Sequence, residues 1–239
     1  MDYVIKEAGI TMGQLINDYK YKYNLKKVCY TGRLDPMARG KVLLLKEEVC
    51  KLMPEYLSKD KIYQFEIVLG IQTDSDDPLE IIENITFDYN HYDVIKKLLL
   101  EINNYIGSVE QKFHKYSSKR INGKPLWYYT KNNIDIPEYP THNVKLNSLR
   151  ILEFKKRYNF VNWKNIIIKQ INSIDKSCDL RQKEIINQWE KLKIGFNHSI
   201  LVEANVSSGF YIRQFIRDLS DNINFPLMVY DINRIDILI

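Results

Sequence analysis

The chain lacks the features of a membrane protein and of a secreted protein held together by disulfides. It has only three cysteines in 239 residues, and Cys29, Cys50 and Cys178 form no Cys-x-x-Cys pair and no Cys/His cluster. This pattern indicates neither a zinc site nor a disulfide framework, and it favours a reducing compartment. No segment approaches the roughly 18 apolar residues of a membrane helix, and the N-terminus lacks the apolar core of a signal peptide. We therefore expect a cytoplasmic protein that binds neither a metal nor a membrane.

The chain also lacks a strong excess of one charge, an internal repeat and a long linker rich in proline, glycine or serine. Its net charge is only +5, which is compatible with a polyanionic partner but does not by itself indicate one. The hydrophobic share of 45% is typical of a globular protein. The length suffices for one large domain or two small ones. We predict a single domain over residues 1–239 and expect a monomer.

Hydrophobic periodicity predicts a mixture of helices and strands. Helices are predicted over residues 10–23, 92–106 and 210–223, and strands over residues 63–69 and 199–206. Thr11 is the expected N-cap of the first helix. The strand at 63–69 alternates at first and then becomes a continuous apolar run, which is typical of a central strand. Strands and helices in this order imply an α+β or α/β domain.

The segment from Thr31 to Gly40 (TGRLDPMARG) contains a carboxylate in a loop whose shape is restricted by glycine and proline. Gly32 and Gly40 permit tight or positive-φ backbone, and Pro36 fixes φ and removes a hydrogen-bond donor. Asp35 therefore has two interpretations. An Asp-Pro pair most often forms an ordinary turn or a helix N-cap, but the same loop could present the carboxylate to a cleft.

Three later segments carry further glycine, tyrosine and basic residues. They are residues 61–76 (KIYQFEIVLGIQTDSD), 116–126 (YSSKRINGKPL) and 207–213 (SSGFYIR). In order, the four segments resemble the conserved blocks of TruB-type tRNA pseudouridine synthases. Those blocks are roughly G-H-T-G-x-L-D-P-x-A-x-G, then K-x-Y followed by L-G-x-x-T-D-T-x-D, then Y-S-A-x-K-x-x-G-K-x-L and S-x-G-T-Y-I-R. The resemblance extends from about residue 28 to about residue 234.

The resemblance implies an α+β pseudouridine synthase fold, with a mixed, mostly antiparallel sheet flanked by helices. The implied activity is isomerisation of uridine to pseudouridine in tRNA or another structured RNA, with the TΨC-loop uridine at position 55 as the expected target. Such an enzyme flips its target base out of the RNA stack, and the reaction has no redox step or group transfer, so no cofactor is expected.

The same resemblance assigns the site residues. Asp35 is the expected catalytic carboxylate, acting on the sugar or base as a nucleophile or removing a sugar proton. Arg213 is the expected cation that keeps Asp35 ionised in a partly dry pocket, and Tyr63 is expected to stack on the flipped uracil. By themselves, Arg213 could be a surface arginine and Tyr63 a core tyrosine. The expected RNA-binding residues are Tyr30, Arg33, Lys61, Tyr116, Arg120, Lys124, Lys131 and Tyr211.

The chain departs from the family pattern in several places. Tyr30 replaces the usual histidine, and no C-terminal RNA-binding PUA domain is expected after Ile239. Residues of about 108–145 are expected to form an RNA-contacting insertion. Residues of about 157–197 match no family block and carry a net charge of +4 with two amphipathic helix patterns. This second insertion could be a solvated hairpin packed on the sheet edge or a lineage-specific surface for RNA or a partner.

Two other functions are open at this stage. The chain could be a catalytically weak RNA-binding or tRNA-folding protein on the same scaffold, an alternative motivated by Tyr30. It could also be a structural subunit of a guide-RNA modification complex, although the Leu69-Gly70 block resembles the guide-independent enzymes more closely.

Overall fold

The computed structural model describes residues 1–136, 138–156, 160–178, 180–193 and 198–239. The remaining residues of the predicted second insertion, 157–159, 179 and 194–197, lie outside the described part of the chain.

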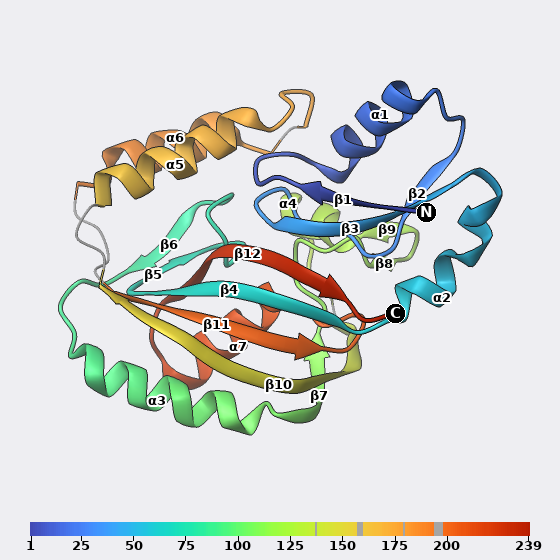
Figure 1. The fold of residues 1–239 in the computed structure, drawn as a ribbon. Helices are drawn as coiled ribbons and strands as arrows, with labels where there is room; N and C mark the ends of the chain where they lie inside the picture. The colour runs from blue at the N-terminus through green and yellow to red at the C-terminus, as the bar shows by residue number, and fades with distance from the viewer. Residues whose placement is uncertain (137, 157–159, 179, 194–197) are drawn as a thin grey trace.

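A mixed sheet forms the centre of the molecule (Figure 1). Within the described residues its strand order is β1-β3-β12-β4-β11-β10-β7, and β2 also pairs with β3. The strands are β1 (Asp2–Lys6), β2 (Val28–Tyr30), β3 (Arg39–Lys46), β4 (Lys61–Leu69), β7 (Gly107–Lys112), β10 (Thr141–Lys156), β11 (His198–Val206) and β12 (Leu227–Ile237). Only the β12–β3 pair is parallel among these pairings. The predicted α+β class with a mostly antiparallel sheet is therefore confirmed.

Strand β4 is the central strand that its apolar run predicted, because it pairs with β12 on one side and β11 on the other. Its odd-numbered side chains, from Tyr63 to Leu69, point to one face of the sheet and pack against α1 (Met12–Tyr23), α3 (His91–Asn104) and α7 (Ile212–Ile223). The three helices predicted from periodicity are thus confirmed, within two residues at each end. Thr11 caps α1 in a capping box with Gln14, also as expected.

The opposite face of the sheet is covered by the second insertion. Its helices α5 (Phe160–Ser173) and α6 (Gln182–Lys191) form a hairpin, which we call the α5–α6 hairpin. Trp163 and Trp189 of the hairpin pack with Val68 of β4 and Met228 of β12. The hairpin therefore lies on a face of the sheet over its central strands and not on the sheet edge. Away from the hairpin, η1 (Glu47–Leu52) and α2 (Met53–Leu57) cover the outer part of β3.

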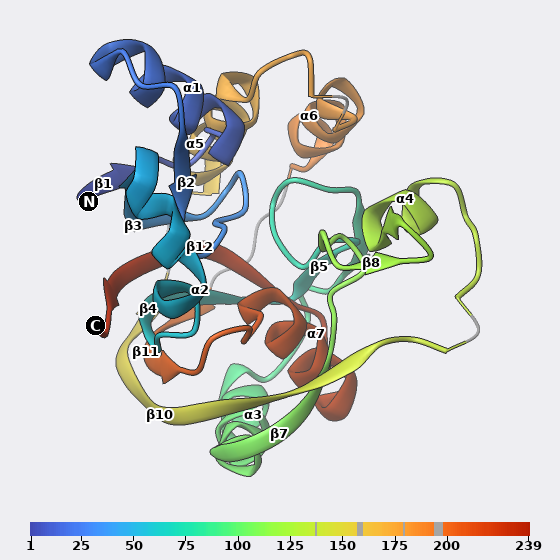
Figure 2. The same cartoon turned by 90° about the vertical axis from the view of Figure 1, so that its right-hand side faces the viewer.

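Two small hairpins complete the described structure. Strands β5 (Ile71–Thr73) and β6 (Ile82–Ile85) enclose the acidic turn that follows β4. Strands β8 (Arg120–Ile121) and β9 (Lys124–Pro125) join α4 (Leu126–Lys131) in a unit that extends to the right-hand side of Figure 2. This unit lies within the predicted insertion at 108–145, but the ends of that range pair with each other as β7 and β10 of the main sheet. In the parts of the chain that are described, no helix has the length and apolarity needed to cross a membrane.

Candidate active site

Asp35 lies in a tight turn that also presents its carboxylate. The Ala38 amide donates a 3.0 Å hydrogen bond to the Asp35 carbonyl, which closes a turn with Pro36 at its second position. The side chain of Asp35 remains 29% exposed. The two interpretations of Asp-Pro are therefore compatible, because the backbone forms the ordinary turn while the carboxylate points away from it.

A buried lysine holds this turn from the inside. Lys6 has no exposed surface, and its Nζ donates to the carbonyls of Ala38 (2.6 Å) and Pro36 (3.1 Å). Burial lowers the pKa of Lys6 to about 8, although the nearby Asp35 carboxylate opposes the shift. The sequence patterns alone did not indicate this contact between Lys6 and the loop.

The other end of the loop is fixed by a buried arginine on β12. Gly40 pairs with Arg234 in the parallel β3–β12 ladder. It has φ +115°, and a Cβ added there would collide with the Arg234 backbone. Arg234 Nε donates to the Lys41 carbonyl (2.7 Å), Nη2 donates to the Gly32 carbonyl (3.1 Å), and Nη1 lies 3.5 Å from the Tyr63 hydroxyl. Arg234 thus joins both ends of the Asp35 loop to β4. The sequence motifs did not indicate this role for Arg234.

Arg213, in the first turn of α7, forms an ion pair with Asp35. Its Nε donates a 2.7 Å hydrogen bond to Asp35 Oδ2, and its Nη1 donates to the Ser75 carbonyl at 3.2 Å. Asp77 Oδ2 lies 3.7 Å from the same Nε. Burial by itself would lower the pKa of Arg213, but the carboxylates of Asp35 and Asp77 raise it above its ordinary value. The guanidinium therefore stays charged and fixes the orientation of the Asp35 carboxylate.

The acidic turn after β5 supports Arg213 and α7, a function that sequence reasoning missed. Asp77 is buried, and it accepts hydrogen bonds from the Leu79 amide (2.9 Å) and the Ser75 hydroxyl (2.8 Å). Asp76 is also buried and pairs with Arg217 of α7 at 2.8 Å. Burial raises the pKa of Asp76 to about 8, against the opposing effect of Arg217. The two carboxylates join the turn to the start of α7.

Tyr63 and three of the expected RNA-binding residues lie near the Asp35 loop. The Tyr63 side chain is largely buried on β4. Lys61 is buried as well, and its Nζ donates to the carbonyls of Leu57 (2.8 Å) and Lys59, so its ammonium is occupied by the chain itself. Arg33 Nη2 donates to the Tyr30 hydroxyl at 3.2 Å in an exposed position. Tyr30 and Arg33 are thus the members of this group that face solvent.

Tyr211 precedes α7 and lies on the Asp35 side of the site. Its backbone exchanges two hydrogen bonds with the Gln111 side chain of β7, at 2.9 Å and 3.1 Å. Burial raises the pKa of the Tyr211 phenol, and the negative charge of Asp35 raises it further. The sheet therefore anchors the Tyr211 backbone, and the phenol lies close enough to Asp35 for the carboxylate charge to act on it.

Tyr116, Arg120 and Lys124 make contacts with residues other than Asp35 and Arg213. The Tyr116 hydroxyl donates to Asp74 and accepts a 3.0 Å hydrogen bond from Arg181 Nη2. Arg120, Lys124 and Lys131 belong to the β8–β9–α4 unit, where Lys124 Nζ contacts the Tyr128 hydroxyl at 3.0 Å. The hydrogen bonds of Arg120 and Lys124 are made to Gly123 and Tyr128 within the same unit.

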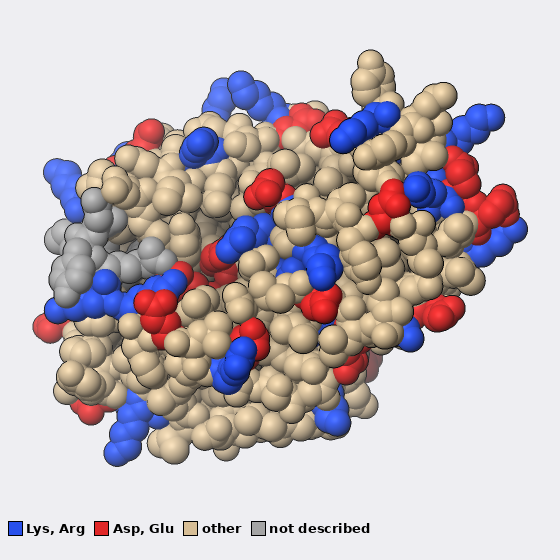
Figure 3. Space-filling model, in the orientation of Figure 1, with Lys and Arg blue, Asp and Glu red and all other residues tan. Residues whose placement is uncertain are grey.

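On the face seen in Figure 3, basic and acidic side chains are interspersed, and no patch of one charge dominates. Within the described ranges, no group of three His, Cys, Asp or Glu side chains could hold a metal ion. The feature that distinguishes the site is instead a carboxylate and a guanidinium held together by buried polar groups.

Comparison with known proteins identifies relatives over most of the chain. A sequence model described as "TruB family pseudouridylate synthase (N terminal domain)" matches residues 20–169. The tRNA pseudouridine synthase B of Mycoplasma capricolum is 31% identical over 96% of this chain and 64% of its own length. The protein of that name from Mycoplasmopsis pulmonis is 27% identical over 98% of this chain and 67% of its own length. This chain thus spans about two-thirds of the length of these relatives.

A solved structure shows the same fold. The crystal structure of a Cbf5–Nop10–Gar1 complex contains a chain that matches with a TM-score of 0.56 and 14% identity, covering 98% of this chain and 47% of that one. The pseudouridine synthase fold expected from the four sequence blocks is confirmed. Since the family's sequence model matches more than half of the residues, this chain belongs to the TruB family of pseudouridylate synthases.

Proposed function

We propose that this protein isomerises uridine to pseudouridine in RNA, and that its substrate is the TΨC-loop uridine at position 55 of tRNA. The observation that carries the proposal is the 2.7 Å ion pair between Asp35 and the buried Arg213. A protein that only binds RNA does not need a partly exposed carboxylate held by a buried guanidinium beside a buried tyrosine. The name tRNA pseudouridine synthase B, which the curated relatives carry, supports tRNA as the substrate.

The chemistry requires one carboxylate and a pocket for a single base. The N1–C1′ bond breaks, the uracil rotates, and a C5–C1′ bond forms, after which C5 loses its proton and N1 carries one. The base must first be flipped out of the RNA stack. Asp35 acts as the nucleophile or as the base that removes a sugar proton, and both actions need the ionised carboxylate that Arg213 stabilises.

The neighbouring residues have separate proposed tasks. Tyr63 stacks on the flipped uracil, and its hydroxyl takes part in proton transfer at C5. Tyr30 and Arg33 contact the RNA at the mouth of the site, and Tyr211 lies beside the target nucleotide. Lys61 acts through its neighbours, because its ammonium already binds the carbonyls of Leu57 and Lys59.

Tyr116, Arg120, Lys124 and Lys131 form a second proposed contact zone for the RNA. Basic and aromatic side chains together suit a looped RNA, whose phosphates are neutralised and whose bases stack. The Tyr116 ring is the part available for such stacking, since its hydroxyl is bound to Asp74 and Arg181.

The proposal is tested by incubating the wild-type protein and Asp35→Asn with an unmodified tRNA transcript. Pseudouridine is then mapped by carbodiimide treatment and primer extension. We expect a stop at the TΨC uridine with the wild type only. Asp236→Asn is a matched control, because it removes a carboxylate that pairs with Lys41 at the surface. Tight tRNA binding without a stop would overturn the proposal in favour of an RNA-binding protein.

A further inference from the structure

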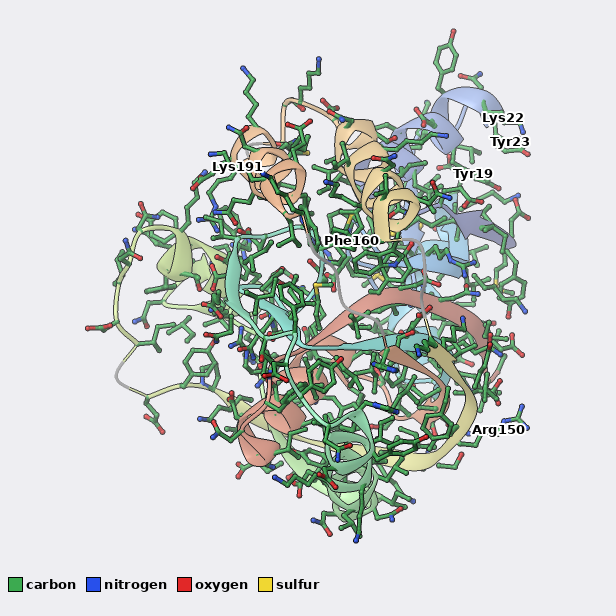
Figure 4. The ribbon with its side chains drawn as sticks, turned by 90° about the vertical axis from the view of Figure 1, so that its left-hand side faces the viewer. Tyr19, Lys22, Tyr23, Arg150, Phe160 and Lys191 are labelled. Atoms are coloured by element: carbon green, nitrogen blue, oxygen red, sulfur yellow. The ribbon has the colours of Figure 1, made fainter. Side chains whose placement is uncertain are left out.

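The α5–α6 hairpin is packed behind the proposed active site. Met37, from the Asp35 turn, belongs to the same buried cluster as Trp163 and Trp189 of the hairpin. On the other side of the turn, a side chain at Gly9 would lie 2.6 Å from the Gln170 carbonyl of α5, so this helix runs directly against the N-terminal segment. Figure 4 shows the two helices side by side above the sheet, with Phe160 labelled on α5 and Lys191 on α6.

Helix α6 also makes polar contacts with residues 74–82, a range that contains the acidic turn. Trp189 Nε1 donates a buried 3.0 Å hydrogen bond to the Pro78 carbonyl, and Gln188 Oε1 accepts a 2.9 Å bond from the Ile82 amide. Arg181, which precedes the helix, donates to Glu80 Oε2 and lies 3.5 Å from Asp74 Oδ2. Three residues from one end of α6 to the other thus contact this segment.

Arg181 is the centre of this polar network. Its guanidinium binds two carboxylates and the Tyr116 hydroxyl, and its backbone has φ 56°, which is uncommon for a residue with a side chain. Glu80 is largely buried, and without Arg181 it would be a buried carboxylate without this partner. Although Arg181 contributes to the insertion's positive charge, its charged group is directed to the protein.

The same segment contacts the proposed catalytic pair on its other side. The Ser75 carbonyl accepts from Arg213 Nη1, and Asp77 lies 3.7 Å from Arg213 Nε. The segment is therefore between Arg181 and Arg213, and only a few residues separate the two contacts. A shift of this turn would move the Ser75 carbonyl and the Asp77 carboxylate, which are the groups that orient Arg213 toward Asp35.

We propose that the α5–α6 hairpin positions the active site through residues 74–82, and that Arg181 is a positioning residue for Arg213 and Tyr116. The inference rests on the proposed function for its catalytic consequence. It also argues against the interpretation of the insertion as an RNA-binding surface. The hairpin acts as a structural support for the site, and the charge of Arg181 serves an internal contact instead of binding a phosphate.

The test compares Arg181→Gln with Arg181→Lys and with Lys183→Gln. Lys183 is an exposed residue in the first turn of α6, so its substitution removes the same charge close to Arg181 without touching the acidic segment. Arg181→Gln loses the charge-assisted hydrogen bonds of the Arg181 guanidinium. This loss should lower kcat on an unmodified tRNA transcript by about 10- to 100-fold. The affinity for tRNA should stay within about threefold, since Arg181 itself touches no RNA in this proposal and Tyr116 keeps its hydrogen bond to Asp74. Arg181→Lys should restore part of the loss, and Lys183→Gln should match the wild type.

A second measurement separates this proposal from the proposed function. Hydrogen exchange should be faster in Arg181→Gln at the amides of Asp74, which bonds Ile81, and of Val229, which bonds Asp76, and unchanged in Lys183→Gln. If the wild type modifies no tRNA, the proposed function fails. The hydrogen-exchange comparison of Arg181→Gln with Lys183→Gln still tests whether Arg181 positions residues 74–82. Equal weakening of tRNA binding by Arg181→Gln and Lys183→Gln, with kcat and exchange unchanged, would overturn it and identify the hairpin as an RNA-binding surface.

Discussion

Arg213 Nε and Asp35 Oδ2 lie 2.7 Å apart although 178 positions separate the two residues in the chain. The two side chains come from different elements, a turn before β3 and the first turn of α7. Buried groups hold both of them, with Lys6 beneath the turn and Ser75 and Asp77 beside the guanidinium. The pair is therefore set by the whole fold, and substitutions in and around it lead to separate expectations.

Arg213→Lys should keep the positive charge at this position but lose the hydrogen-bond geometry of the guanidinium. A lysine cannot contact both Asp35 and the Ser75 carbonyl as the guanidinium does. Loss of a charge-assisted hydrogen bond should lower kcat by about 10- to 100-fold, whereas Arg213→Gln should lower it by on the order of 10³ or more. Single-turnover kinetics on tRNA measure both changes. Wild-type rates in Arg213→Lys would show that only the charge at this position matters.

Tyr63→Phe should separate the stacking of the ring from the chemistry of the hydroxyl. The hydroxyl has only a 3.5 Å contact with Arg234 in the described structure, so its removal should change the free energy of unfolding by less than about 1 kcal/mol. If the hydroxyl transfers a proton, kcat should fall by about 10²- to 10⁴-fold while tRNA affinity is kept. Full activity of the phenylalanine variant would exclude that role and leave stacking alone.

Gly40→Ala should destabilise the protein by about 2–4 kcal/mol, because it adds backbone strain and a collision. The residue has φ +115°, and a Cβ there would meet the backbone of Arg234. Gly123→Ala is the matched control, since Gly123 also has positive φ (+80°) but nothing lies within 4 Å of the added carbon. Chemical denaturation should give the control a loss of only about 1 kcal/mol. Equal losses would show that the contact with β12 is not what restricts Gly40.

Glu80 should make the stability of the protein depend on pH in a defined window. Burial raises its pKa from the ordinary 4.5 to about 7, against the opposing charge of Arg181. The folded state therefore holds this proton more tightly than the unfolded state. The resulting stability is fully present below about pH 4.5 and is lost as the pH rises through about 7.

Glu80→Gln removes this titration. The free energy of unfolding of the wild type relative to Glu80→Gln should fall by about 3 kcal/mol, as an order of magnitude, between pH 4.5 and 8. Urea titrations of both proteins at several pH values measure the difference, in which other titrating groups cancel. A difference that does not vary with pH would mean that Glu80 stays ionised throughout this range.

Local patterns in the sequence were enough to predict most of the helices and the central strand. The apolar run of β4 predicted a central strand, which the structure places between β12 and β11, and Thr11 predicted the start of α1, because burial and capping depend on short-range spacing. The order of the four sequence blocks predicted the family and the fold. The roles of Asp35, Tyr63 and Arg213 in the reaction stay predictions.

What the sequence by itself determined is therefore most of the helices, the strands β4 and β11, and the turn that carries Asp35, since periodicity and backbone restriction by Pro36 and Gly40 act locally. Only the tertiary structure decided which charges are buried. Lys6, Arg234 and Arg181 look like ordinary surface residues in the sequence, because charged side chains are mostly exposed. Their burial or pairing depends on carbonyls and carboxylates that distant segments bring to them when the sheet and the α5–α6 hairpin assemble.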